Sequence, residues 1–333
     1  MRFIFVTVVT LALAGLGASY FWLEQRFDLP APTVDLDIEP GTSVRGIAKA
    51  VAEAGAPVNP DLLYWWFRLS GQSRQIKAGS YELTRDTTPR NLLQKLVHGD
   101  ETLGSVTIVE GWTFRQMQNA LAKAEHLRPE SQALSQETLM RLLGRPGLAP
   151  EGRFFPDTYT YRKGSSDVAL LQRALRAMDK KLAAAWALRD PDSPLQTPEQ
   201  ALTLASIVEK ETASPDDRAT IAAVFCNRLR IGMRLQTDPS VIYGMKESFD
   251  GNLRKKDLQT DTPWNTYTRS GLPPTPIAMA GKAALLAAVR PAPSTALYFV
   301  ARGDGTSQFS NTLEEHNRAV NQYQRAQRAR TTP

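Results

Sequence analysis

The feature that most restricts the fold of this chain is an uncharged, apolar stretch over residues 3–23. Its length matches the ~20 residues that an α-helix needs to cross a bilayer. A cleaved signal peptide would have a shorter apolar core and a small-residue cleavage site. Here the stretch ends in three aromatics at 20–22 and then meets Glu24 and Arg26, as at a membrane interface. We therefore expect an uncleaved transmembrane anchor with a cytoplasmic N-terminus.

Composition excludes several classes of protein. The 333 residues allow two or three domains, at roughly 100–200 residues each. A scattered net charge of +6 does not indicate a nucleic-acid partner. The single cysteine, Cys226, cannot form an internal disulfide. The three histidines lie far apart in the sequence, so we expect no metal site and no cofactor.

A weak internal repeat follows the apolar stretch, because residues 38–45 resemble residues 108–115. Each copy predicts a strand, a glycine-containing turn, a Ser or Thr helix cap and a short helix, over residues 44–54 and 114–124. Small α+β modules of this kind resemble LysM-type glycan-binding units. A spacer domain without a ligand is the alternative.

Two helices with clear start signals lie in the second half of the chain. Thr197, a following proline and Gln200 form a capping-box pattern. Ser214 and the next proline repeat the start, with acidic residues placed to complement the helix dipole. These signals predict helices over residues 198–212 and 215–230.

Glu211 falls in the last turn of the first of these helices. At ~100° per residue it shares a face with Leu204, Ile207 and Val208, whereas Glu209 points the opposite way. Loss of hydration and the negative end of the helix dipole would both raise its pKa. The acid would then stay protonated near neutral pH, as a general acid requires. On spacing alone, a salt-bridged glutamate at a helix end is the simpler interpretation.

Several longer segments resemble the endolytic murein transglycosylases of the MltG/YceG-like family, and the resemblance covers nearly the whole chain. The matching segments are residues 205–212, 224–229 and 233–244, with shorter ones at 265–267, 271–274 and 297–300. The resemblance implies an α+β fold with a lysozyme-like catalytic domain, in which the catalytic glutamate precedes a Ser or Thr. Glu211 and Thr212 fit that pair, which selects Glu211 over Glu209.

The resemblance also implies further site residues. Leu235 and Gln236 resemble a sugar-contacting Met-Gln element, and Asn265 and Tyr267 resemble an element that supports the catalytic acid. Trp264 departs from the family, where a tyrosine is common, and an indole cannot accept the hydrogen bonds of a phenol. The substrate-binding residues implied are Gln236, Thr237, Asp238, Asn265 and Tyr267.

The reaction that the resemblance implies is non-hydrolytic. Glu211 would protonate the oxygen between N-acetylmuramic acid and N-acetylglucosamine, then take the proton from the muramyl C6 hydroxyl as a 1,6-anhydro ring closes. Such an enzyme would end nascent glycan strands near the inner membrane, in contact with penicillin-binding synthases. One alternative is a peptidoglycan hydrolase that uses Glu211 and Asp238 as its two carboxyls. The other is a non-catalytic glycan-binding scaffold.

The expected organisation follows from these observations. We predict a cytoplasmic tip and transmembrane anchor over 1–26, a linker over 27–33 and a LysM-like α+β module over 34–105. A YceG-like catalytic domain over 106–333 would begin with a second LysM-like repeat at 106–127. The predicted location is the inner membrane, crossed once, with the catalytic domain in the periplasm.

Overall fold

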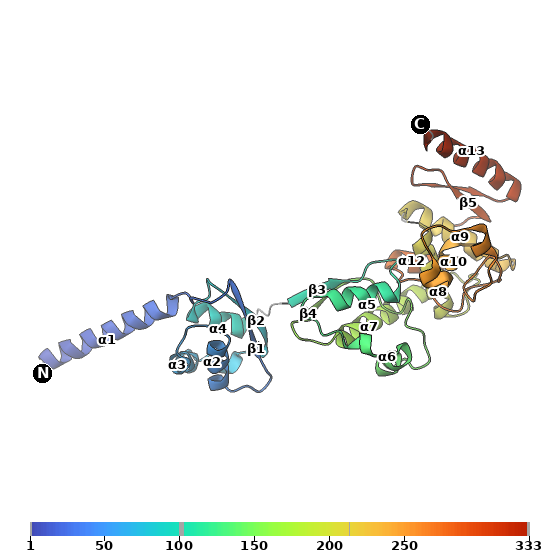
Figure 1. Cartoon of the computed structure of the whole chain (residues 1–333). Coiled ribbons are helices and arrows are strands. Elements are labelled where there is room, and N and C mark those ends of the chain that lie inside the picture. The colour runs from blue at the N-terminus through green and yellow to red at the C-terminus, as the bar shows by residue number, and fades with distance from the viewer. Residues whose placement is uncertain (1, 100–102, 213, 332–333) are drawn as a thin grey trace. The chain divides into compact units, whose positions relative to one another are not determined.

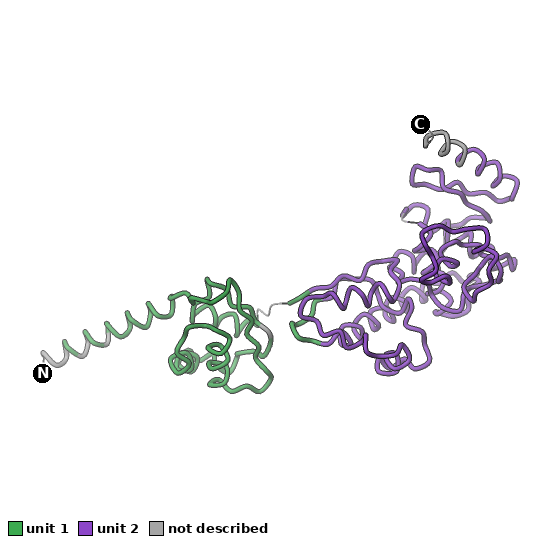
Figure 2. Tube along the Cα trace, viewed as in Figure 1, with its two compact units in different colours: residues 1–104, 160–165 green, residues 105–159, 166–333 purple. Residues whose placement is uncertain are grey.

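The computed structural model describes residues 2–99, 103–212 and 214–331. The chain divides into two compact units (Figures 1 and 2). Unit 1 comprises residues 1–104 and 160–165, and unit 2 comprises residues 105–159 and 166–333. The domain boundaries expected from the sequence stay a prediction.

The N-terminal apolar stretch forms a helix, α1 (Arg2–Glu24). Apolar side chains along it are exposed, among them Leu11, Leu16 and Phe21. Within the described ranges, the structure contains no helix that combines the length and the hydropathy of a membrane span. The predicted helix is therefore confirmed, and the transmembrane role predicted for residues 3–23 is not found.

Unit 1 continues as a small α+β fold around one core. Its two strands pair antiparallel, with Thr33 opposite Thr84 and Ile38 opposite Gly79. Ser43 caps the first helix after the strand by accepting the N–H of Gly46, as the sequence predicts. The elements that follow α1 are β1 (Thr33–Ile38), α2 (Val44–Glu53), α3 (Pro60–Leu69), η1 (Ser73–Gln75), β2 (Gly79–Thr84) and α4 (Pro89–His98).

Unit 2 is mainly helical and carries two small two-stranded sheets, β3 with β4 and β5 with β6, although β3 and β4 each extend past the unit boundary. Its first half contains β3 (Leu103–Thr107), α5 (Phe114–Lys123), η2 (Glu130–Ala133), α6 (Gln136–Leu142), β4 (Thr158–Arg162) and α7 (Asp167–Trp186). Its second half contains α8 (Pro198–Glu211), α9 (Pro215–Arg230), α10 (Asp238–Met245), η3 (Lys246–Ser248), α11 (Lys255–Gln259), α12 (Lys282–Val289), β5 (Tyr298–Ala301), β6 (Ser307–Ser310) and α13 (Leu313–Thr331).

The two helices with strong start signals lie where the sequence predicts them. Thr197 caps α8 by accepting the N–H of Gln200, and Ser214 caps α9 in the same way. The reciprocal half of the capping box at α8 differs from expectation. The side chain of Gln200 accepts the N–H of Gln196, one residue before the cap, at 2.6 Å.

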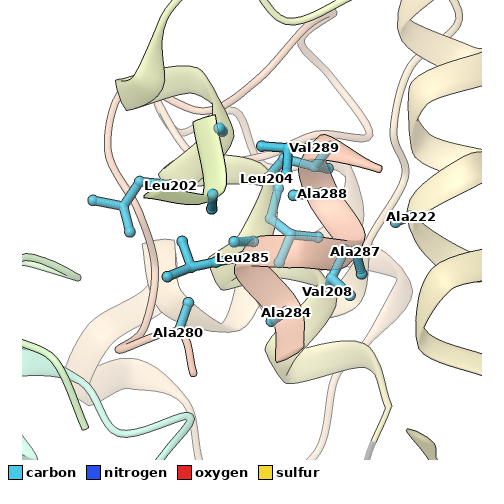
Figure 3. Close-up of a cluster of buried hydrophobic side chains, with 14 of the residues drawn as sticks. Leu202, Leu204, Val208, Ala222, Ala280, Ala284, Leu285, Ala287, Ala288 and Val289 are labelled. Carbon is cyan, nitrogen blue, oxygen red and sulfur yellow. The ribbon is translucent and has the colours of Figure 1, made fainter. Parts of the chain in front are cut away.

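Helix α8 is buried on all sides rather than along one stripe. Every residue from 201 to 208 is buried, and α7, α9 and α12 all pack against it. Figure 3 shows the short side chains of α12, including Ala284 and Ala288, beside Leu204 and Val208 of α8. Alanines allow the two helices to approach closely. The side of α8 on which each residue lies therefore does not distinguish Glu211 from Glu209 as the acid, contrary to the argument from helix periodicity.

Candidate active site

Glu211 ends helix α8, and the chain leaves the helix at Thr212 with extended backbone angles. Its carboxyl is half-buried. Burial raises the pKa of Glu211 to about 6, and the nearby Asp238 carboxylate adds to the rise, whereas a hydrogen bond from Thr237 and the charge of Arg228 oppose it. About half of Glu211 is therefore protonated at pH 6, and about a tenth at pH 7.

Glu209, two residues earlier, has a different task. Its Oε2 accepts the backbone N–H of Gly281 at 2.9 Å, and Gly281 is the N-cap residue of α12. A carboxylate there satisfies a free donor at the positive end of that helix. Burial raises the pKa of Glu209 as well, but its contact is with the backbone of a neighbouring helix. This supports the choice of Glu211 that the Glu-Thr pair indicates.

Thr237 holds the carboxyl of Glu211 directly. Its hydroxyl donates to Oε1 of Glu211. Thr237 occupies the cap position of α10, yet its side chain does not cap that helix. The residue is 1% exposed, and its backbone N–H donates to the hydroxyl of Thr266 at 3.0 Å. A threonine that is fixed in this way orients one oxygen of the acid and leaves the other available.

Asp238 and Tyr267 form a second pair beside the acid. The Tyr267 hydroxyl donates to Oδ1 of Asp238 at 2.5 Å. The charge of Asp238 raises the pKa of Glu211, and both Asp238 and Glu211 raise that of the Tyr267 phenol, for which burial is the largest cause. The structure therefore brings together four of the residues predicted from the sequence, namely Glu211, Thr237, Asp238 and Tyr267.

Arg228 is a functional candidate that the sequence reasoning did not single out. It is 7% exposed, and its guanidinium donates to the carbonyl oxygens of Leu297 and Leu235, at 2.7 and 2.5 Å. Its charge lowers the pKa of Glu211. Arg228 lies within residues 224–229, a segment that carries the family resemblance. Its position in that segment is the one sequence feature that could have indicated a functional role.

Gln236 precedes Thr237 in a left-handed backbone conformation, with φ of 50°. A residue other than glycine adopts this conformation at a cost that the surroundings must offset. Its N–H donates to the carbonyl of Thr266 at 3.1 Å, and its side chain is exposed. Leu235, by contrast, is fully buried. A sugar contact by Gln236 stays a prediction.

Asn265 lies in the protein interior, and its amide is used within the chain. Its Nδ2 donates to the carbonyls of Leu258 and Thr260, and its Oδ1 accepts the N–H of Tyr267 at 2.8 Å. The side chain is 0% exposed. In this structure Asn265 fixes the loop that carries Tyr267, and a direct substrate contact stays a prediction.

A cavity of about 760 Å³ lies between α5, α10 and the segment around Trp264. Glu211 does not line it, but the adjacent Lys210 does. Its wall includes Glu151, a residue for which the sequence offered no functional signal. Glu151 accepts the N–H of Phe114 at 2.9 Å, and burial raises its pKa to about 7.

Replacing Thr237 with valine should separate the role of its hydroxyl from that of its shape. Valine removes the hydrogen bond that lowers the pKa of Glu211, so the pKa should rise and the carboxyl should lose its fixed orientation. We expect glycan cleavage to fall by about 10- to 100-fold, with the pH profile of kcat moved to higher pH. Thr237→Ser keeps the hydroxyl and should retain most of the activity. Equal losses in both variants, with an unchanged pH profile, would contradict this role.

Taken together, these residues form an arrangement that suits acid/base chemistry by a carboxylic acid. Glu211 has a raised pKa, an orienting hydroxyl and a buried cation nearby. The YceG-like family matches residues 36–322 of the chain. The chain belongs to the YceG-like family.

Individual relatives agree with this assignment. The chain is 30% identical over 308 residues to an endolytic murein transglycosylase of Bacillus subtilis (strain 168), covering 87% of this chain and 85% of that protein. It is 29% identical over 358 residues to an endolytic murein transglycosylase of Streptococcus pneumoniae serotype 2 (strain D39), covering 96% of this chain but 64% of the longer relative. A crystal structure of a putative yceG-like protein from Listeria monocytogenes aligns with a TM-score of 0.55 and 28% identity, over 86% of this chain and 98% of that one. The α+β fold of YceG-like type that the sequence predicts fits these comparisons, whereas the predicted LysM-like modules are not shown by them.

Proposed function

We propose that the chain is an endolytic murein transglycosylase, a lyase that cuts the glycan strands of peptidoglycan with Glu211 as its acid and base. The observation that carries this proposal is the half-buried Glu211 with its raised pKa, held by the Thr237 hydroxyl. The relatives from B. subtilis and S. pneumoniae, which bear that name, support it.

In the proposed reaction, protonated Glu211 donates its proton to the glycosidic oxygen that leaves with N-acetylglucosamine. The N-acetyl group of the muramyl residue stabilises the positive charge that develops at C1. The Glu211 carboxylate then accepts the proton of the muramyl C6 hydroxyl as the C6 oxygen bonds to C1. No water is consumed, Glu211 regains its proton, and the strand ends in 1,6-anhydro-N-acetylmuramic acid.

The raised pKa of Glu211 predicts how activity depends on pH. The first step needs the protonated acid, so kcat should fall as the pH rises through about 6, the pKa of Glu211. We expect about a tenfold loss per pH unit on the alkaline side. Initial rates measured on glycan strands between pH 4.5 and 8.5 test this, with stability followed in parallel. Activity that rises through this range would contradict Glu211 as the initial acid.

The products distinguish the proposal from a hydrolase that uses Glu211 and Asp238. Purified protein should be incubated with polymeric glycan strands and the products analysed by mass spectrometry. A lyase yields anhydromuramyl ends, which are lighter by one water than reducing ends. Reducing ends alone would support the hydrolase, and intact strands that remain bound would support the scaffold.

We also propose that the protein acts at the inner membrane, in the periplasm, where it ends nascent strands beside penicillin-binding synthases. The exposed apolar side chains of α1 support this location. Carbonate extraction and protease protection in intact spheroplasts would test it, and release into the soluble fraction would contradict it. The β1, α2, α3, β2 order of unit 1 supports a LysM-like, glycan-binding role for that unit.

A further inference from the structure

The cavity beside α10 has the size and the walls of a ligand site. Its volume is about 760 Å³, within the roughly 300–1,000 Å³ that ligand pockets occupy. Tyr243 and Trp264 form an aromatic wall, with ring centroids 5.5 Å apart and planes at 68°. The Trp264 indole donates to the Thr275 hydroxyl at 2.9 Å, which fixes the ring. Such a wall is preformed rather than assembled by the ligand.

Charge on the lining is predominantly positive. Arg115, Lys210 and Lys246 supply three cations. The two carboxyls of the lining are Glu247, which pairs with Arg115, and Glu151, whose pKa burial raises to about 7. Among the described residues, neither Lys210 nor Lys246 is in an ion pair with a carboxylate, and Lys210 donates to the carbonyl of Gly111 at 3.3 Å. Two cations therefore remain available to an anionic ligand.

Lys246 also has an unusual backbone. It follows α10 directly and is the first residue of η3, with φ of 52° and ψ of −124°, a region that residues with side chains rarely adopt. Strained residues cluster at ligand-binding positions because the surrounding structure must hold them there. The cavity lining therefore contains a lysine at a position where the backbone conformation favours glycine.

We propose that this cavity binds the anionic peptide stem attached to the muramyl residue next to the cleaved bond. The proposal rests on the proposed function, because it names a part of that substrate. In strands that carry their stems, the lactyl carboxyl of N-acetylmuramic acid is bonded to the stem as an amide, so the sugars themselves carry no charge. Free lysines then add nothing to the recognition of the sugars, whereas the carboxylates of a stem peptide match them. Lys210 directly precedes Glu211, so a ligand that contacts it lies close to the reacting bond.

Two forms of one substrate test this inference. Uncrosslinked strands that carry their stems are compared with the same strands after an amidase has removed the stems, which leaves one lactyl carboxylate on each muramyl residue. The comparison therefore tests the carboxylates farther along the stem, and not the presence of any negative charge. The wild type should cleave stem-bearing strands with about a tenfold higher kcat/KM, the effect expected of two exposed charge pairs. The double variant Lys210→Ala with Lys246→Ala should lose this preference to within about twofold.

A matched control removes the same amount of charge elsewhere. Lys255 and Lys256 are exposed lysines on α11, outside the cavity lining, and their double replacement by alanine should keep the preference. Equal cleavage of both substrates by the wild type, equal losses of both in the Lys210 and Lys246 variant, or the same loss in the control would each overturn the inference.

Failure of the proposed function gives a separate result. If the wild type cleaves neither substrate, the function is wrong, and calorimetry with a soluble muramyl peptide then decides the inference. Binding that the Lys210 and Lys246 replacements weaken about tenfold supports the cavity as a stem site. Absence of binding to the wild type, or equal binding to both proteins, overturns it.

Discussion

Replacing Glu211 with glutamine is expected to abolish glycan cleavage and to leave the fold intact. Glutamine has nearly the same shape, and its carbonyl oxygen can still accept the Thr237 hydroxyl. It cannot donate an acidic proton or accept one back. Because the same carboxyl acts in both proposed steps, we expect kcat to fall by more than about 10³-fold. Cleavage is measured by the release of soluble fragments from strands, with circular dichroism and thermal unfolding as checks of the fold.

Although Glu211→Gln should lose its activity, we expect this variant to be more stable than the wild type at neutral pH. The folded-state pKa of Glu211, about 6, lies above its ordinary value of 4.5. The wild type therefore keeps its full stability below pH 4.5 and loses part of it as the pH rises through 6. Glutamine does not ionise, so Glu211→Gln should be more stable than the wild type above pH 7, by up to about 2 kcal/mol.

Glu209→Gln is the matched control for this variant. It makes the same chemical change two residues away, where the carboxylate accepts the N–H of Gly281. The control should retain cleavage. Loss of cleavage in Glu209→Gln together with normal cleavage in Glu211→Gln would reverse the assignment of the acid.

Replacing Asn265 with alanine is expected to lower stability more than any other single change at the site. It leaves the carbonyls of Leu258 and Thr260 and the N–H of Tyr267 without the partly buried hydrogen bonds that they make with Asn265. A hydrogen bond of this kind contributes about 1 kcal/mol to stability, so we expect the loss of all three to cost about 3 kcal/mol. For a unit of this size the melting temperature should fall by roughly 6–12 °C.

Asn252→Ala is the corresponding control, because Asn252 is exposed in a nearby loop. A surface replacement of this kind should change stability by less than about 0.5 kcal/mol. Calorimetric unfolding measures both variants. An unchanged melting temperature in Asn265→Ala with a raised KM would restore the substrate-binding role that the sequence implies for Asn265.

Local signals in the sequence predicted the helices well. The bounds of α8 and α9 follow from caps and prolines within a few residues, namely Thr197, Pro198, Ser214 and Pro215. Such signals act through neighbouring backbone groups and need no knowledge of the fold. They also sufficed to place Glu211 at a helix end.

The site beyond Glu211 depends on contacts between distant residues, which no local pattern encodes. The helical wheel assumed one exposed face of α8, whereas α12 and α9 cover it on other sides. Thr237 occupies the cap position of α10, but its hydroxyl is directed to Glu211, which the sequence did not indicate. The involvement of Arg228 and Glu151 likewise depends on partners that are remote in the chain, such as Leu297 and Phe114.

The alanine-lined contact between α8 and α12 ties the chemistry of the site to the volume of the core. Ala284 and Ala288 are 0% exposed, so a larger side chain at either position must displace one of the helices. Glu211 is the last residue of α8, so its carboxyl moves with that helix. A displacement of about 1 Å at a reacting group can lower the rate about 100-fold. Larger side chains at Ala284 or Ala288 therefore change the position of the Glu211 carboxyl, although neither residue is part of the site. In a screen for more active variants, we therefore expect few tolerated substitutions at the contact between α8 and α12 and more of them in the exposed loops.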